Sequence, residues 1–447
     1  MPPLFPLPLT PFEYYYWCDD RADYPTTYPV ELTFSGVLDP EPFCRAVATI
    51  VDRHPLLSAR IQQEGRGMPV WIDGDGQPPV VDWADADAPI GHPQGQRIDL
   101  SSAPGLRIWV RRSDGATRVV LQFHHACCDG LAGARVVEEL LLAYHELVAG
   151  RDPAAVLRPL EPQRLRARGD YGAERTARPS LRDLWVGGAA WLKLLAHTPA
   201  PLAAPAADVD IASRMPFPGF VTEIWDASKI RRLRGVASSL GGTLNDLLLR
   251  DLFQVLGHWN SRYDGPGNPW LRINVPTTLR TRDDALAPAA NALGFAFLTR
   301  RTRECEQGDE LFDSIRRETE AIRRFRLGLY FVGGLAMACR VPGVIPRMLE
   351  RKRSFATIVM SNLGKIFHRT ALPRRDGRLM CGDAVLLRVA GVPPIRPLTR
   401  AAIAVGSYGG ETTFTLRCDP RHFSVEQAEG FLAEYIARLD HTAESKS

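Results

Sequence analysis

Two adjacent histidines lie where an apolar strand gives way to a helix, and this junction is the strongest constraint that the sequence places on the fold. The strand reads RVVLQFHH over residues 118–125. Successive side chains on a strand point to opposite faces of the sheet, so His124 and His125 face away from each other. Only one of the two imidazoles can therefore enter a given cleft.

The residues after the two histidines predict a turn and a helix. Residues 126–130 read ACCDG, and apolar side chains then recur at helical spacing over 136–148. An imidazole at such a strand end has an ordinary pKa of about 6.5 and can accept a proton near neutral pH, which indicates a general base. Because the two histidines diverge, a metal site that uses both of them with Asp129 is disfavoured, and we predict no metal.

The length and composition predict a globular chain of more than one domain. There are 447 residues, and 55 Lys and Arg against 51 Asp and Glu give a net charge of +4. That charge is too small over this length to attract nucleic acid, which we exclude as a partner. Eight cysteines without a C-x-x-C pair, and an N-terminus unlike a secretion signal, predict reduced thiols and a cytoplasmic location. No stretch is long and apolar enough for a membrane span.

Short β-rich runs alternate with amphipathic helical stretches on both sides of a segment rich in Arg, Pro and Ala. We therefore predict an α/β protein with an N-terminal subdomain (residues 1–150), a linker (151–213) and a C-terminal subdomain (214–447). The predicted strands are residues 28–34, 106–112 and 118–125 before the linker, and 220–225, 271–277, 355–362 and 401–419 after it. The last helix begins at Ser424, whose spacing to Gln427 is that of a capping box.

Residues 181–197 of the linker predict an amphipathic helix. One face of it collects six large apolar side chains: Leu181, Leu184, Trp185, Trp191, Leu192 and Leu195. A helix packed on its own domain accounts for this pattern. The alternative is a helix that touches lipid through its two tryptophans, which predicts peripheral membrane contact through residues 181–197.

The run HHACCDG at residues 124–130 has the form H-H-x-x-x-D-G and resembles the signature of the chloramphenicol-acetyltransferase-like superfamily. This superfamily includes condensation domains of nonribosomal peptide synthetases, polyketide-associated acyltransferases, and bacterial wax-ester synthases and diacylglycerol acyltransferases. Six more segments are similar to motifs of the superfamily and follow in the right order: RHPLLSARI (53–61), IDLSSAPGLRIWV (98–110), LNDLLL (244–249), RINVPTTLRTR (272–282), NALG (291–294) and VMSNLG (359–364).

The resemblance implies a fold of two α/β subdomains in a V, with a tunnel between them that is open at both faces. It implies that His125 is the general base and that His124 is structural. Asp129 would point away from the cleft and pair with an arginine, for which Arg280 is the candidate, so that the pair holds the loop. Gly130 would occupy a turn in which a Cβ collides with the facing backbone.

The resemblance also implies the reaction. An acceptor hydroxyl or amine attacks an acyl thioester while His125 removes its proton, and no covalent acyl-enzyme is required. Ser361 and Asn362 are candidates for binding the oxyanion or the substrate, with a plain β-turn as the alternative. Because the x positions of the motif are usually packing residues in the superfamily, we expect packing rather than nucleophilic roles for Cys127 and Cys128.

The acyl donor has to come from outside the chain, because no segment resembles the serine site of a carrier protein. We expect acyl-CoA, or acyl-phosphopantetheine on an acyl carrier protein, as cosubstrate, an alcohol or amine as acceptor, and no bound cofactor. The leading hypothesis is a freestanding O-acyltransferase, because several of the matches are wax-ester-like. The alternatives are an amide-forming condensation enzyme that acts on carrier-bound substrates and an inactive binding protein of the same fold.

Overall fold

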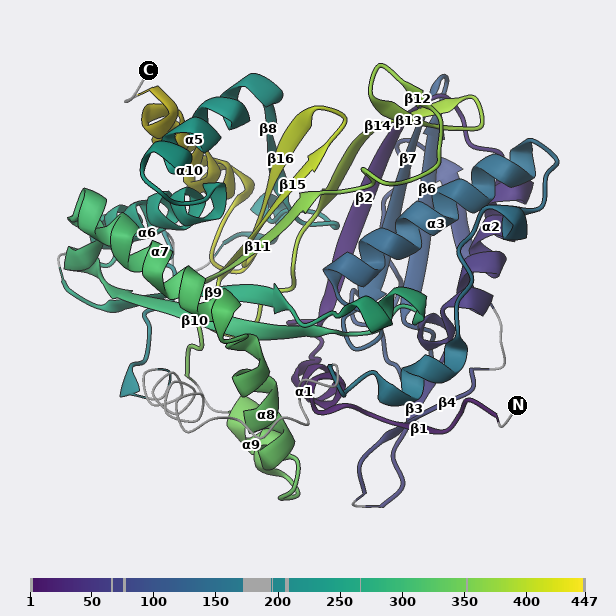
Figure 1. Cartoon of the computed structure of the whole chain (residues 1–447), viewed down its shortest axis with the longest axis horizontal. Helices are drawn as coiled ribbons and strands as arrows, with labels where there is room; N and C mark the ends of the chain where they lie inside the picture. Colours follow the sequence, from purple (N-terminus) through teal and green to yellow (C-terminus); the bar gives the residue numbers. More distant parts are fainter. Residues whose placement is uncertain are drawn as a thin grey trace.

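The computed structural model describes residues 3–65, 67–74, 78–171, 194, 196–205, 209–265, 267–350 and 353–444. Figure 1 shows two lobes side by side, each built on a sheet with helices packed against it. Helix α1 (Pro11–Asp19) lies where the lobes meet, in contact with α8 (Gly328–Ala338) and α9 (Val344–Glu350).

The first lobe contains a sheet whose described strands run in the order β12-β13-β14-β2-β7-β6-β5. Its strands are β2 (Thr27–Ser35), β5 (Val81–Asp85), β6 (Leu106–Ser113), β7 (Ala116–His124), β12 (Arg374–Arg375), β13 (Arg378–Cys381) and β14 (Ala384–Gly391). Helices α2 (Pro40–Arg53) and α3 (Gly130–Val148) pack together in this lobe. Strand β7 pairs with both β2 and β6, so the strand that ends in His124 is an interior strand of the sheet.

The second lobe contains a sheet whose described strands run in the order β10-β9-β11-β15-β16-β8. Its strands are β8 (Val221–Asp226), β9 (Trp270–Thr278), β10 (Leu293–Arg301), β11 (Ile358–Lys365), β15 (Ala401–Tyr408) and β16 (Glu411–Cys418). Its helices are α5 (Ala227–Ser239), α6 (Leu244–Tyr263), α7 (Gly308–Arg324) and α10 (Val425–Glu444). Strand β11 pairs in parallel with both β9 and β15, which places it in the interior of the sheet.

Part of the C-terminal half crosses into the first lobe. Strand β14 pairs antiparallel with β2, so residues 374–391 extend the N-terminal sheet. Pairing between strands so distant in sequence leaves no local signal. The predicted division into residues 1–150, 151–213 and 214–447 therefore does not include this crossing. Those boundaries stay a prediction. A small third sheet joins β1 (Leu7–Pro8), β4 (Val70–Ile72) and β3 (Arg60–Gln62).

Aromatic packing fixes α1 to the second lobe. The ring of Phe12 meets Phe295 of β10 and Phe331 of α8 edge to face, with centroids 5.1 and 6.0 Å apart. These residues belong to one apolar core that continues through the first lobe. The two lobes are therefore joined by close-packed side chains, which resist displacement.

Side-chain caps define where several helices begin. Thr10 and Glu13 form a capping box at α1, and Thr243 and Asp246 form one at α6. The box predicted for the last helix is confirmed: Ser424 N–H donates to Gln427 Oε1 (2.9 Å) and Gln427 N–H to Ser424 Oγ (3.2 Å). Such reciprocal bonds satisfy N–H groups that have no partner within the helix.

The amphipathic helix predicted over residues 181–197, with Trp185 and Trp191, lies almost entirely outside the described residues. In the described part of the chain, no helix combines the length and the apolar character that crossing a membrane requires.

Candidate active site

A cavity of about 420 Å³ lies between the two lobes. Its walls come from α1 and β2 on one side and from β9, β10, β11 and α8 on the other. Many of its lining side chains are apolar or aromatic, including Tyr15, Phe295, Phe297, Phe331, Leu335 and Met348. The predicted site residues that line it are His125, Asp129, Gly130, Arg280, Ser361 and Asn362. The structure thus brings these residues to one cavity from both lobes. That the cavity opens at both faces stays a prediction.

His125 follows the last residue of β7, and its backbone N–H donates to the carbonyl of Thr26 (2.8 Å). Its imidazole is buried between two tyrosines. The ring of Tyr16 is stacked on it with centroids 4.1 Å apart, and the ring of Tyr28 meets it edge-on at 5.1 Å. Tyr16 Oη lies 3.3 Å from Nε2. Because Nδ1 is inaccessible, Nε2 is the nitrogen that a substrate can reach.

The surroundings of His125 keep its imidazole neutral. Burial lowers the pKa of His125 to about 4, although the charge of Asp129, the residue's own backbone carbonyl and the Asn291 amide act in the opposite direction. Desolvation disfavours the charged form of a buried base. At pH 7 the ring is therefore in the neutral form, which is the form that can accept a proton.

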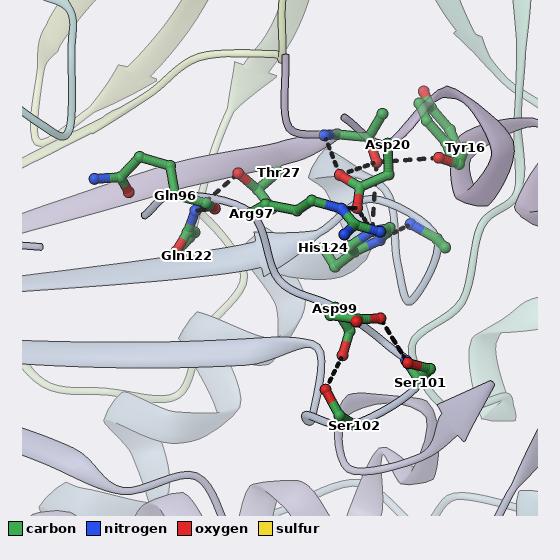
Figure 2. Close-up of polar contacts among 12 residues, drawn as sticks. Tyr16, Asp20, Thr27, Gln96, Arg97, Asp99, Ser101, Ser102, Gln122 and His124 are labelled. Carbon is green, nitrogen blue, oxygen red and sulfur yellow. Dashed lines mark hydrogen bonds and ion pairs between the residues drawn. The ribbon is translucent and has the colours of Figure 1, made fainter. Parts of the chain in front are cut away.

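His124 lies in a separate polar network (Figure 2). Its Nδ1 accepts the N–H of Ala126 (3.1 Å), so Nε2 carries the proton and faces Thr26 Oγ1 at 3.4 Å and Asp20 Oδ2 at 3.7 Å. Asp20 also accepts from Arg97 Nε (2.6 Å). Burial alone would raise the pKa of Asp20, but the contacts with His124, Thr26 and Arg97 bring it below its ordinary value. His124 is fully buried and is not among the residues that line the cavity.

Asp129 is the N-cap of α3. Its Oδ1 accepts the N–H groups of Leu131 and Ala132 (3.1 and 3.0 Å), and its Oδ2 accepts the N–H of Ala292 (2.8 Å). Arg280 Nη1 lies 2.8 Å from Oδ2, as an ion pair rather than an aligned hydrogen-bond donor. The pairing inferred from the sequence is thus present in the structure. Both carboxylate oxygens are occupied by these contacts, which fix the turn.

Residues 289–292 of the second lobe hold the histidine turn in place. Asn291 Nδ2 donates to the carbonyl of His125 (2.7 Å) and to that of the next residue (2.9 Å). On the other side, His54 Nδ1 accepts the N–H of Ala289 (2.9 Å). The orientation of His125 therefore depends on both lobes.

The tight approach predicted for Gly130 is not found. A Cβ added there would meet only Leu363 Cδ2, at the ordinary contact distance of 3.6 Å. The expectation was wrong because the first residue of α3 faces the cavity instead of a neighbouring backbone. A glycine that is crowded against the motif is Gly105, where a Cβ would lie 2.1 Å from Cys127 Sγ.

We expect the variants Gly130→Ala and Gly105→Ala to differ in stability. Gly130→Ala should leave the free energy of unfolding unchanged or raise it by up to about 1 kcal/mol, because its backbone conformation suits alanine. Gly105→Ala should lower it by about 1–3 kcal/mol through overpacking against Cys127. Urea denaturation of the two variants tests the order, and a more damaging change at Gly130 would contradict it.

The two cysteines of the motif are buried. Burial raises the pKa of the Cys127 thiol well above its usual value and that of Cys128 to about 12. Cys128 Sγ also lies 3.2 Å from Tyr28 Oη. Protonated, inaccessible thiols are poor nucleophiles, in agreement with packing roles. Within the described ranges, no three His, Cys, Asp or Glu side chains are grouped as a metal site would require.

Ser361 and Asn362 lie within strand β11, so the β-turn alternative is wrong. The strand has a bulge between Asn362 and Gly364, which turns this stretch of backbone locally. Asn362 Oδ1 accepts the N–H of Gly364 (3.0 Å), and its Nδ2 donates to Asn245 Oδ1 (3.3 Å). These contacts fix the Asn362 amide on the wall contributed by the second lobe.

Helix α1 contributes to the site in a way that the sequence did not predict. Tyr16 on this helix contacts His125, and Asp20 at its end lies beside His124. The role of Asn291 was not predicted either, although this residue lies in one of the matching segments. The available signal for α1 was the Thr10 to Glu13 spacing of a capping box before three consecutive tyrosines. That signal predicts a helix but does not show what the helix contacts.

The fold is that of the chloramphenicol-acetyltransferase-like superfamily. The first condensation domain of the calcium-dependent antibiotic synthetase, in complex with a substrate analogue, superposes with a TM-score of 0.70 and 16% identity over 98% of this chain and 97% of that one. Polyketide synthase associated protein 5 from Mycobacterium tuberculosis gives 0.63 and 17% over 99% of both chains. A mutant starter condensation domain of rhizomide synthetase, in complex with C8-CoA, gives 0.66 and 14% over 98% and 95%. The predicted fold class is confirmed, and these neighbours have the fold that the resemblance implied.

Comparison of sequences also finds relatives. An uncharacterised protein of Mycobacterium tuberculosis (strain H37Rv) is 23% identical over 443 residues, which cover 93% of this chain and 95% of that protein. The phthiocerol/phthiodiolone dimycocerosyl transferase of Mycobacterium leprae (strain TN) is 28% identical over 152 residues, 33% of this chain and 36% of that protein. No family model matches the chain.

Proposed function

We propose that this protein transfers an acyl group from a thioester to an acceptor hydroxyl, with His125 as the general base. The observation that carries the proposal is a buried, neutral imidazole in the wall of a largely apolar cavity between the lobes. Such a cavity excludes water and can hold an acyl chain, while the imidazole accepts the proton that the reaction releases. The relative named as a dimycocerosyl transferase and the structural neighbour in complex with C8-CoA support acyl chemistry.

The proposed step needs one base and no covalent intermediate on the protein. As the acceptor oxygen bonds to the acyl carbon, its proton moves to His125 Nε2. The C–S bond then breaks, and the departing sulfur takes that proton, which leaves an ester, a free thiol and a neutral imidazole. Ser361 and Asn362 are the candidates for donating to the oxyanion that develops between these two events. Asp129 exchanges no proton in this scheme, because its carboxylate is held by three N–H groups and Arg280.

The proposed cosubstrates are acyl-CoA or an acyl-phosphopantetheine on a carrier protein, and an alcohol as acceptor. We test the proposal by mass spectrometry of the products formed from a panel of acyl thioesters of increasing chain length with alcohol and amine acceptors. Ester products would establish O-acyl transfer, and amide products would establish the condensation alternative. Thioester binding without any product would show that the protein is a binding member of the fold.

The activity should change little between pH 7 and pH 5. The neutral fraction of an ordinary imidazole, with a pKa of about 6.5, would fall about 25-fold over this range. His125, which titrates near 4, stays neutral throughout and gains its proton only at lower pH. We therefore expect kcat/KM to fall less than about twofold, with circular dichroism at each pH as the control for unfolding. An acid limb centred near pH 6.5 would contradict this assignment.

A further inference from the structure

The ring of Tyr16 lies against the face of the proposed base, and the step described above makes no use of it. The two rings are nearly parallel, at an angle of 14° and a centroid distance of 4.1 Å. In this geometry Tyr16 Oη, 3.3 Å from Nε2, lies over the face of the imidazole. The Nε2 lone pair points outward in the plane of the ring. The tyrosine therefore covers the ring and leaves the lone pair available to the acceptor.

Tyr28 restrains the imidazole from a second direction. Its ring meets His125 edge-on, at 64° to the imidazole plane. Its hydroxyl donates to the carbonyl of Asp129 (3.1 Å), which fixes the tyrosine to the turn. With Tyr16 on the face and Tyr28 at an angle to it, rotation of the imidazole about its side-chain bonds is blocked.

Helix α1 carries Tyr16, and the first turn of this helix is anchored by a buried ion pair. Glu13 is fully buried and accepts from Arg168 Nε and Nη2, both at 2.8 Å. Trp71 Nε1 also donates to this carboxylate (3.0 Å). A bidentate, buried pair of this kind has little freedom to move. Tyr16 lies three residues after Glu13, one turn along the same helix.

The end of α1 is tied to both histidines. Thr26 connects the backbone of Tyr16 to the side chains of Asp20 and His124, because its Oγ1 lies 3.4 Å from Asp20 Oδ1 and 3.4 Å from His124 Nε2. Thr26 Oγ1 donates to the carbonyl of Tyr16 (3.1 Å), and the carbonyl of Thr26 accepts the N–H of His125 (2.8 Å). The same short segment therefore holds the Tyr16 phenol and the His125 imidazole in position relative to each other.

We propose that Tyr16 is a positioning residue whose aromatic face fixes the plane of the His125 imidazole and stabilises the imidazolium that forms during acyl transfer. This inference rests on the proposed function. The proton of the acceptor passes directly to Nε2 and then to the departing sulfur. Tyr16 keeps its own proton throughout, because burial raises its pKa well above the usual value. The ring, and not the hydroxyl, is the part that acts.

The test compares Tyr16→Phe with Tyr16→Leu. The phenylalanine variant keeps the aromatic face, and we expect its kcat within about threefold of the wild type. The leucine variant loses the face, and we expect kcat to fall about 10- to 100-fold while KM changes less than about threefold. Tyr14→Leu is the matched control. Tyr14 lies on the same helix, is absent from the cavity wall and has its ring against Trp17 (6.0 Å), so kcat should stay within about twofold.

Each contrary result has a distinct meaning. Equal losses in the two Tyr16 variants would assign the effect to the hydroxyl and overturn the inference. A wild-type kcat in Tyr16→Leu, or a loss that disappears when kcat is divided by the folded fraction, would also overturn it. A wild-type protein that transfers no acyl group refutes the proposed function itself, whereas an active wild type with a fully active Tyr16→Leu variant refutes the role of Tyr16 alone.

Discussion

Replacement of His125 by alanine should lower kcat about 10²- to 10⁴-fold, the range that a positioned general base contributes. The fold should survive, because the side chain lines a cavity and its main polar ties to the protein run through the backbone N–H and carbonyl. Those bonds are retained in alanine. Steady-state kinetics with the best thioester of the panel, together with thermal unfolding, measures both effects.

His124→Ala is the matched control for this prediction. It removes the donor that faces Asp20 and leaves a buried carboxylate with fewer partners. We expect a loss of about 1–3 kcal/mol in the free energy of unfolding, with a smaller effect on the kcat of the folded fraction. Equal losses of activity in two well-folded variants would contradict the assignment of the base to His125.

Breaking the Asp129 and Arg280 pair should destabilise the protein strongly. Removing one partner of a buried ion pair costs about 3–5 kcal/mol, because the remaining charge stays buried without its partner. Asp129→Asn removes the charge of the carboxylate that accepts from Ala292 N–H and pairs with Arg280. Arg280→Met leaves that carboxylate facing apolar atoms. Activity should fall with stability, since this turn carries His125. Chemical denaturation of both single variants and of the double variant measures the losses.

The double variant should cost less than the sum of the two single changes, because the groups are 2.8 Å apart. A cycle at the more exposed pair Arg378 and Glu411, which are 2.9 Å apart, is the control, with an expected coupling below about 1 kcal/mol. Simple additivity at Asp129 and Arg280 would show that the contact contributes nothing to the stability of the turn.

The local course of the histidine motif could be predicted from the sequence. Alternation along a strand separates His124 from His125, and the structure gives them separate surroundings, with His125 beside the cavity and His124 beside Asp20. The helix cap at Ser424 could be predicted for the same reason, because its hydrogen bonds with Gln427 join residues three positions apart. Both features depend on near neighbours in the chain, which local periodicity specifies.

Contacts between distant segments could not be predicted in this way. Strand β14 joins the N-terminal sheet, and Asn291 reaches the carbonyl of His125 across 166 positions of sequence. The misjudged environment of Gly130 has the same origin, because what faces a residue depends on which elements pack nearby. Strand pairing and side-chain contact over such separations are set by packing, for which a single sequence carries no local signal.

The sequence by itself thus determined the strand, turn and helix that present one imidazole to a cleft, through the two-residue period of a strand and the cap of a helix. Only the tertiary structure decided the state and orientation of that imidazole. The pKa of His125 falls to about 4 because two lobes bury it, and its plane is set because Tyr16, 109 positions earlier, packs against its face. Burial and ring stacking exist only once these segments have come together.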